Sequence, residues 1–263
     1  MSMSLTQQSL GYSAQSVAGQ VREHNEDAVL CLPRLGLWAV ADGMGGHQCG
    51  EVASALALKI LGDEVGSGTA LDQAILCAHR NILAASEQAG GRAMGSTLVA
   101  VQFVDDEFEV AWVGDSRAYR VSLDGIVQLT HDHSWVQAMI DAGELSQEQA
   151  RQHPRRNIVT QCLGLAGQAL EVGRVRGRLQ PGELLLLCSD GLTGELNDEQ
   201  IQAVCASAAT LDELVEQLVG LANQLGGRDN ISCVALAHNV ADSPQIATKS
   251  RNFISRWLTS RKH

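Results

Sequence analysis

Acidic side chains stand at the ends of the most apolar segments of this sequence. Asp42 ends the run LWAVAD, and Asp190 ends the run LLLLCSD. Continuous apolar runs are typical of strands covered on both faces, so each carboxylate is expected to lie against the core. An ionised group there needs a cation, hydrogen-bond donors or a proton. Four more acids stand at the ends of other apolar runs: Glu26, Asp27, Asp115 and Asp229.

The chemistry open to these acids depends on whether they meet in space. Few basic residues stand close to them in sequence, namely Arg22, Arg117 and Arg228. Carboxylates held together raise one another's pKa unless a cation neutralises them. Ligands that are all oxygen atoms favour Mg or Mn over zinc, which binds His or Cys at short spacings. Two interpretations of the acids are therefore open: they form one metal centre, or they are separate turn and capping residues.

The remaining Asp-Gly pair, Asp124-Gly125, has polar, hairpin-like flanks and is interpreted as a turn. No glycine loop has the GxGxxG or GxxxxGK[ST] form of nucleotide sites. Ser116 and Ser189 follow or precede an acid, but no GxSxG elbow surrounds them, so neither is predicted to be a nucleophile. His131 and His133 flank Asp132 and are interpreted as capping and solvated residues.

The elements that must position the acids come in blocks. Apolar residues recur every three or four positions in two successive segments, which predicts two amphipathic helices, and β-branched segments then predict antiparallel strands. Blocks of this kind favour an α+β fold with antiparallel sheets over a doubly wound parallel sheet. The first two helices are expected at 50–65 and 71–88. Strands are expected at 96–104, 107–115, 169–180, 182–191 and 230–238, with a further pair within 117–130 joined at Asp124-Gly125, and two more helices precede the last strand.

Two segments stand apart from this pattern. Residues 131–164 are polar, with a short helix at 134–143 and a capping box at Ser146 to Gln149, and are predicted to form a flap. A second capping box is expected at Thr210 to Glu213. Residues 241–263 form a basic tail, in which a helix would gather Phe253, Ile254, Trp257 and Leu258 on one face. This tail either packs on the acidic body or contacts a membrane surface or a partner.

Composition limits the class of protein. The net charge of −11 argues against a nucleic-acid binder, because clustered Lys and Arg hold phosphate backbones. Seven cysteines without a CxxC pair are expected to be reduced core residues, which suggests a cytoplasmic protein. No secretory signal and no bilayer-spanning apolar stretch is expected.

Eight motifs occur in the order found in one known family: VREHNEDA, ADGMGGHQCGEVAS, MGSTLVAV, VGDSRAYR, LTHDHSWV, HPRRNIVTQCLG, LLLCSDGLTGEL and GGRDNISCVAL. From about Gly19 to Leu236 the chain resembles the metal-dependent type 2C serine/threonine protein phosphatases, above all the small bacterial single-domain members. The resemblance implies a four-layer α-β-β-α sandwich, with two antiparallel sheets flanked by helix pairs. It also implies a binuclear Mn or Mg centre, with two or three ions per chain, and a catalytic domain over residues 1–240.

The resemblance also assigns roles to residues. Asp42 matches the carboxylate that bridges two metals, Gly43 a carbonyl ligand, and Asp190 and Asp229 the ligands of one metal. The glycines after Asp42 would let the backbone approach the metals. Arg22 matches the side chain that grips the substrate phosphate. Glu26 and Asp27 match acids that hold metal-bound waters, and Asp115 with Asp190 matches a third metal site.

The implied reaction is hydrolysis of phosphoserine and phosphothreonine by a hydroxide that bridges the two metals. Many eukaryotic relatives carry a proposed general acid, a histidine, where this chain has Met44. His47 lies nearby but fits a surface or supporting residue better, and metal-bound water is our preferred proton donor.

The expected partners are phosphorylated proteins and a cognate Ser/Thr kinase that this chain, expected to be a monomer, would oppose. Two rival functions stay open: hydrolysis of small phosphate esters at the same centre, and a catalytically silent regulator that binds phosphorylated partners. The silent regulator is disfavoured, because a binding module does not need six strand-end acids.

Overall fold

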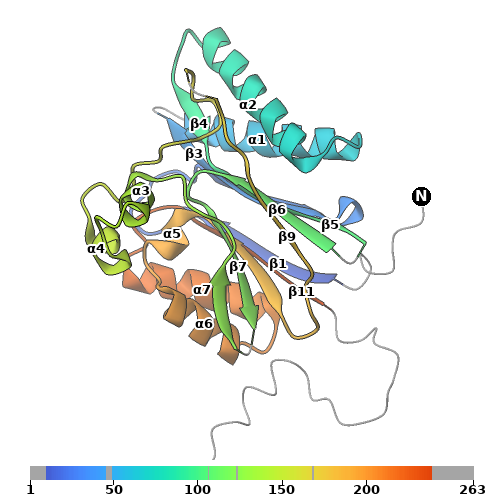
Figure 1. Ribbon diagram of the computed structural model, residues 1–263, viewed down its shortest axis with the longest axis vertical. Coiled ribbons are helices and arrows are strands. Elements are labelled where there is room, and N and C mark those ends of the chain that lie inside the picture. Colours follow the sequence, from blue (N-terminus) through green and yellow to red (C-terminus); the bar gives the residue numbers. More distant parts are fainter. Residues whose placement is uncertain (1–9, 46–48, 106, 123, 168, 239–263) are drawn as a thin grey trace, which may run out of the picture.

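The computed structural model describes residues 10–45, 49–105, 107–122, 124–167 and 169–238. They form two antiparallel sheets packed face to face, with helices on both outer faces (Figure 1). This confirms the predicted α+β class and the four-layer sandwich. The first sheet has the order β2 (Asp27–Leu32), β3 (Leu37–Gly45), β5 (Leu98–Val104), β6 (Glu107–Val113), β9 (Gly173–Gly177), with β4 (Met94–Ser96) paired to the end of β3. The second has the order β1 (Leu10–Val17), β11 (Ile231–His238), β10 (Leu184–Cys188), β7 (Arg117–Ser122), β8 (Gly125–Gln128).

Three apolar layers explain why the central strands are continuously apolar. Along β3, Ala39 and Ala41 face the helices on the first sheet, whereas Trp38 and Val40 face the second sheet. Strands β10 and β11 alternate in the same way between the space between the sheets and the helices below. Both faces of the central strands are therefore buried over most of their length.

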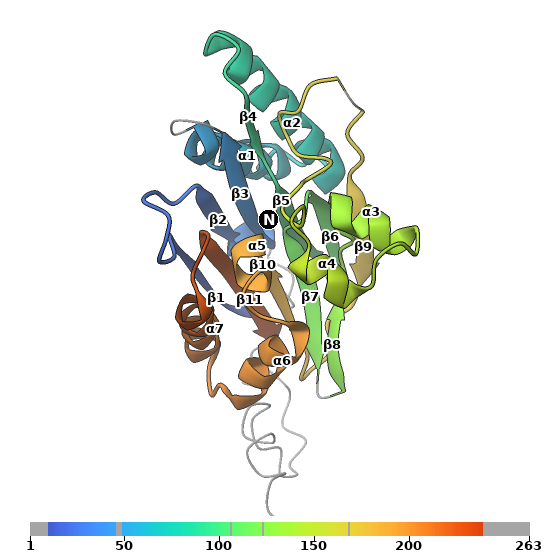
Figure 2. The ribbon, with the colours of Figure 1, turned by 90° about the vertical axis from the view of Figure 1, so that its left-hand side faces the viewer.

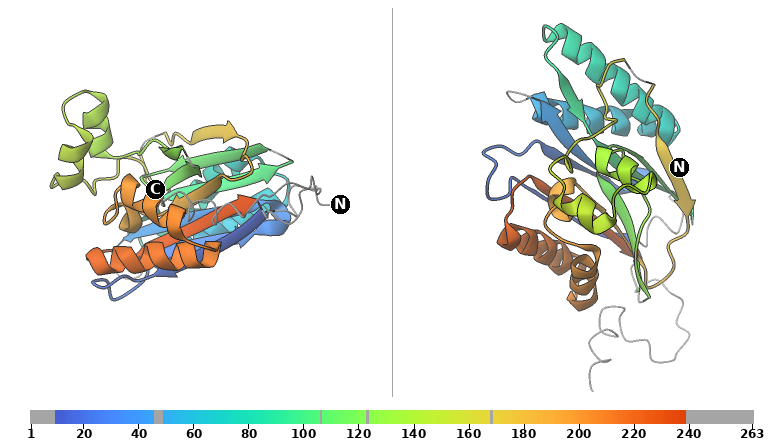
Figure 3. Two further views of the ribbon diagram at one scale, coloured as in Figure 1. Left: turned by 90° about the horizontal axis from the view of Figure 1, so that it is seen from below. Right: turned by 60° about the vertical axis from the view of Figure 1, so that its left-hand side comes forward.

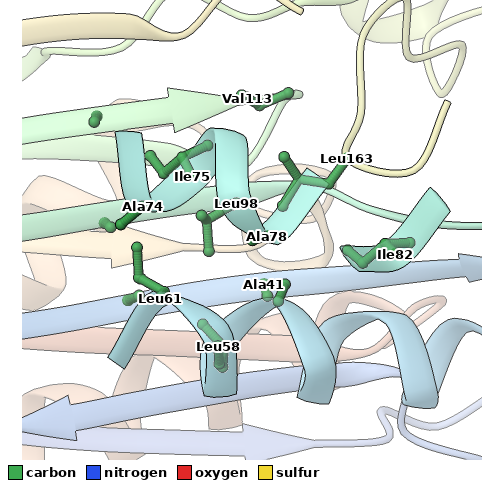
Figure 4. Close-up of a cluster of buried hydrophobic side chains, with 14 of the residues drawn as sticks. Ala41, Leu58, Leu61, Ala74, Ile75, Ala78, Ile82, Leu98, Val113 and Leu163 are labelled. Carbon is green, nitrogen blue, oxygen red and sulfur yellow. The ribbon is translucent and has the colours of Figure 1, made fainter. Parts of the chain in front are cut away.

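A helix pair covers each sheet. The helices α1 (Cys49–Gly66) and α2 (Leu71–Gln88) cover the first sheet, as predicted, and Figure 4 shows Leu61 and Ile75 gathered over Ala41 and Leu98. The helices α6 (Asp198–Ser207) and α7 (Leu211–Leu225) cover the second sheet, with the short α5 (Asp190–Thr193) beside β11.

The capping of the second pair differs from the prediction. Thr210 caps α7, but the Glu213 carboxylate accepts from the backbone N–H of Ala209 and not from that of Thr210, so the predicted box is half formed. A complete box opens α6 instead, between Asn197 and Gln200.

The predicted flap leaves the sandwich at one end. It carries α3 (Trp135–Asp141) and α4 (Gln147–Gln152), which lie beside α5 in both views (Figures 2 and 3). The capping box at Ser146 and Gln149 is confirmed. The centroids of the Trp135 and His153 rings are 4.8 Å apart. The Arg155 guanidinium carbon lies over the Trp135 ring, 5.1 Å from its centroid. This stack ties the two halves of the flap together.

Other expectations concern the chain as a whole. None of the seven cysteines forms a disulfide, and five of them are buried, as predicted, whereas Cys31 and Cys77 are only partly buried. Within the described ranges, no helix has both the length and the apolar character needed to cross a bilayer. His47 and the 241–263 tail lie outside the described residues.

Candidate metal centre

Asp42 and Asp27 lie opposite each other on β3 and β2, where both strands reach the end of the sandwich. The backbone of Asp42 is held by Thr97, whose Oγ1 accepts from the Asp42 N–H at 3.1 Å and whose N–H donates to the Asp42 carbonyl at 2.8 Å. The same Oγ1 lies 2.7 Å from the Ser116 hydroxyl. The side chain of Asp42 is therefore left free to face the gap between the sheets.

Asp27 is a buried carboxyl with an incomplete set of partners. Its Oδ2 accepts from the Ser189 hydroxyl at 2.7 Å, whereas Oδ1 has no hydrogen-bond partner among the described residues. Burial raises the pKa of Asp27 to about 7. A buried oxygen of this kind is a position where a cation or a water would be stabilised. Ser189, directly after β10, therefore acts as a hydrogen-bond donor and not as a nucleophile.

The second sheet contributes Asp190 and Asp229. Asp190 is the first residue of α5, directly after β10, and Asp229 stands two residues before β11. The two loops are in backbone contact, because a Cβ on Gly191 would lie 1.9 Å from the Asn230 carbonyl oxygen. Only glycine fits at position 191, and this contact holds the two acids on adjacent strands side by side.

The charges of these acids act on one another. Burial is the largest cause that raises the pKa of Asp42, of Asp115 and of Asp190. The charges of the other acids raise these pKa values further, Asp27 and Asp190 for Asp42, and Asp229 for Asp190. The Asp42 carboxyl lies close enough to Asp190 to oppose part of the rise in the pKa of Asp190. The acids therefore retain protons or take cations.

Glycines pack the backbone closely around Glu26. The Gly43 N–H donates to the Glu26 carbonyl at 3.1 Å, and a Cβ on Gly43 would lie 2.0 Å from the Gly50 carbonyl oxygen. A Cβ on Gly50, in the first turn of α1, would lie 2.7 Å from Glu26 Oε1. Two of the four glycines in the loop after Asp42 are thus required by close packing at this site.

Arg22 lies at the outer side of the cluster. Its Nη2 donates to Asp229 Oδ2 at 2.8 Å, and its side chain is half exposed. The Asn230 amide, which the sequence did not single out, fixes the loop that carries Arg22: it accepts from the Glu26 N–H and donates to the carbonyls of Ala18 and His24. Arg228 instead pairs with Glu195.

A second arginine near the acids was not assigned a role from the sequence. Arg117 forms a buried ion pair with Asp132, with Nη2 2.7 Å from Oδ2, and donates to the Tyr119 hydroxyl. Its charge opposes the rise in the pKa of Asp115 and of Asp190. Asp132 is buried in this pairing and His133 is half-buried, so the interpretation of His133 as solvated is corrected, whereas His131 is exposed, as predicted.

A cavity of about 170 Å³ separates the flap from the acids. Its walls include Asp115 and Asp190 on one side and α3 and α4 on the other. Arg156 lines it, whereas Arg155 is stacked on Trp135. The two arginines of the HPRRN motif therefore have different surroundings.

The residues fit a divalent metal centre. Six acids supply only oxygen ligands, and one of their buried oxygens lacks a partner. In the described part of the chain no three of these side chains already converge closely enough to enclose an ion. Two of the acids have local partners instead: Asp229 accepts from Arg22, and Asp27 accepts from Ser189. Hard cations such as Mg and Mn favour this donor set.

Comparisons with known proteins point to the same chemistry. The family model described as protein phosphatase 2C matches residues 19–228. The chain is 36% identical over 236 residues to the serine/threonine phosphatase stp of Listeria innocua, covering 84% of this chain and 93% of that protein. It is similar to the crystal structure of the Mycobacterium tuberculosis serine/threonine phosphatase PstP/Ppp, with a TM-score of 0.80, 33% identity and coverage of 88% and 99% of the two chains. A PstP catalytic domain in complex with two manganese ions matches with a TM-score of 0.77, 32% identity and coverage of 87% and 98%.

Proposed function

This chain belongs to the protein phosphatase 2C family, and on that premise we propose how its acidic cluster and its flap divide the work of the reaction. The protein is a metal-dependent serine/threonine phosphatase that hydrolyses phosphoserine and phosphothreonine and uses Mn or Mg. The roles of individual residues are our assignment, and they combine the family pattern with the geometry of the cluster.

The acids would hold the metals as follows. Asp42, the Gly43 carbonyl, Asp190 and Asp229 would hold the two ions. Glu26 and Asp27 would hold waters of the metal centre, and Asp115 with Asp190 would hold a third ion. When bound, the ions supply an activated water and offset the charge of the phosphate. The incomplete partners of Asp27 and the raised pKa values of Asp42, Asp115 and Asp190 support these roles.

Arg22 would bind the substrate phosphate. It uses Nη2 for Asp229, and its other guanidinium nitrogens have no hydrogen-bond partner among the described residues. A half-exposed guanidinium next to the acids can donate two parallel hydrogen bonds to a phosphate. Arg22 therefore orients the phosphate while the acids hold the ions.

The substrate is a phosphoprotein, and we assign its selection to the flap. The cavity between the flap and Asp190 has room for residues that flank the phosphorylated side chain. Arg156 lines this cavity, where its positive charge suits an acidic or phosphorylated neighbour; the same charge lowers the pKa of Glu195. Arg155 stacks on the Trp135 ring, and we assign it to the stability of the flap and not to substrate binding.

The wider setting is also a proposal. We place the protein in the cytoplasm as a monomer with a catalytic domain over residues 1–240 that reverses a Ser/Thr kinase in bacterial signalling. We assign the tail at 241–263 to packing on the acidic body, with membrane or partner contact as the alternative. Deletion after Asp242 should lower the thermal midpoint and leave hydrolysis of small esters intact. Binding of the full-length chain to anionic liposomes, with an unchanged midpoint on deletion, would favour the alternative.

The meeting of acids from both sheets at one buried end carries the proposal. The decisive experiment measures phosphate release from a phosphothreonine peptide with Mn, without added metal and with chelator. Metal-dependent release is expected, and binding of the peptide without release would identify a silent regulator. A kcat/KM that is higher for a phosphoprotein than for a small aryl phosphate separates this function from a small-ester hydrolase.

A further inference from the structure

The turn that carries Asp115 passes from one sheet to the other in three residues. Strand β6 ends at Val113 in the first sheet, and β7 begins at Arg117 in the second. Gly114 has a φ of +102°, and a Cβ there would lie 2.6 Å from Thr97 Cγ2. Thr97 and the Ser116 hydroxyl bonded to it therefore fix one side of the turn.

A single residue of the flap root holds the other side. The His133 N–H donates to the Gly114 carbonyl at 2.9 Å, and the Gly114 N–H donates to His133 Nδ1 at 3.2 Å. Both backbone polar groups of Gly114 are thus bound by His133. Because Nδ1 accepts, the neutral ring carries its proton on Nε2. Burial lowers the pKa of His133, which favours this neutral form.

His133 is itself fixed from three directions. The His133 ring lies 6.4 Å from the Trp112 ring. The His133 carbonyl accepts from the N–H of Thr160 at 2.8 Å, in the segment by which the flap returns to the sandwich. The preceding residue, Asp132, forms the ion pair with Arg117 on the far side of the turn. The outgoing and returning ends of the flap therefore meet at the residue that binds Gly114.

We propose that His133 is a positioning residue that sets the place of the Asp115 carboxylate through its two bonds to Gly114, and thereby sets the affinity for the third metal ion. The inference rests on the proposed function, which assigns Asp115 to that ion. We assign His133 no contact with the ion: its Nδ1 is occupied by the Gly114 N–H, and its effect on the ion passes through Gly114 and Asp115. His133 also links the flap to the third ion site. A displacement of the flap root would therefore lower the affinity for the third ion before it affects the other two.

Two variants separate the hydrogen bond from the packing. His133→Asn keeps an acceptor near the position of Nδ1 but loses the ring, and His133→Phe keeps the ring against Trp112 but loses the acceptor. Should the Phe variant fail to fold, His133→Gln is the matched partner of the Asn variant, because its amide reaches toward Nε2 and away from Gly114.

The first measurement is amide hydrogen exchange of Gly114 in the metal-free protein. Loss of one backbone hydrogen bond corresponds to roughly tenfold faster exchange in the Phe or Gln variant, with the Asn variant near wild type. The second is the number and affinity of bound Mn ions, counted from the paramagnetic resonance of free Mn. The weakest site should lose roughly tenfold in affinity in the Phe and Gln variants while the two tighter sites are retained.

The outcomes distinguish this inference from the proposed function. Wild-type protein that binds no Mn and releases no phosphate refutes the function itself, whatever the exchange rates are. If Asp115→Asn retains the weakest Mn site, the third-ion assignment is wrong. Equal Mn affinity in the Phe variant and wild type, or an equal loss in the Asn and Gln variants, overturns the role of His133.

Discussion

Asp27→Asn should stabilise the metal-free protein at neutral and higher pH, and the effect should disappear in acid. Asp27 is a buried carboxyl with one oxygen unpartnered among the described residues. Burial raises its pKa from the ordinary value of 3.8 to about 7. The folded state therefore holds a proton that the unfolded chain releases, and the stability this provides is fully present below pH ~4 and is lost as the pH rises to about 7.

The magnitude follows from linkage. Each pH unit between the two pKa values changes the free energy of unfolding by about 1.4 kcal/mol. Between pH 5 and pH 8 the wild type should therefore lose roughly 2 to 3 kcal/mol through Asp27 alone, a loss that a neutral Asn does not suffer. The raised pKa values of Asp42, Asp115 and Asp190 act in the same direction. Asp27→Asn also removes the charge that raises the pKa of Asp42, so Asp42 loses part of its own pH dependence in the variant, which adds to the difference from wild type.

The assay is urea denaturation in chelator at pH 5, 6, 7 and 8, followed by tryptophan fluorescence. Asp63→Asn is the control, because Asp63 is exposed and its pair with Lys59 lies on the surface of α1. It should shift stability by less than about 0.5 kcal/mol at every pH. Parallel pH profiles of Asp27→Asn and wild type would refute the reasoning. Saturating Mn should flatten the wild-type profile, because bound cations neutralise the acids.

Three further predictions concern the reaction. Asp42→Asn and Asp190→Asn should each abolish phosphate release and leave the metal-free thermal midpoint unchanged or higher; near-normal turnover of Asp190→Asn in saturating Mn would contradict the assignment. Arg22→Ala should raise KM for a phosphoprotein by roughly 10- to 150-fold, because it removes a charge-assisted hydrogen bond worth about 1.5 to 3 kcal/mol, and it should leave the Mn affinity unchanged. Weaker Mn binding with an unchanged KM would mean that Arg22 serves the metal centre and not the phosphate. Arg156→Ala should lower kcat/KM for a phosphoprotein more than for a small aryl phosphate, with Arg155→Ala as the matched change at a stacked arginine; equal effects of Arg156→Ala on both substrates would count against a role in selection.

The sequence identified the acids because their signal is local. The apolar runs that end in Asp42 and Asp190 predict buried strands, and a charged side chain at the end of a buried strand is costly unless it has a partner. The helix pair at 50–65 and 71–88 was visible for the same reason, since its periodicity is set by neighbouring residues.

Residues that act across the sandwich gave no such signal. Thr97, Asn230 and Arg117 matter through partners that are distant in sequence, and nothing beside them marks those partners. His133 was interpreted as solvated because the sequence does not show that the turn at Gly114 ends where the flap begins. The capping of α6 by Asn197 is a local signal that was available and was missed.

The place of β11 in the second sheet constrains how the chain can be made. Among the strands that the structure describes, β1 pairs only with β11, so that Leu10 lies opposite His238 and Val17 opposite Ile231. During synthesis β1 therefore waits without a partner until nearly all of the domain has been translated. Asn230, which fixes the loop bearing Arg22 and the backbone of Glu26, arrives with the same strand. A nascent or truncated chain that lacks β11 should accordingly have no formed phosphate site, and the enzyme gains its activity only when its last strand inserts between two earlier ones.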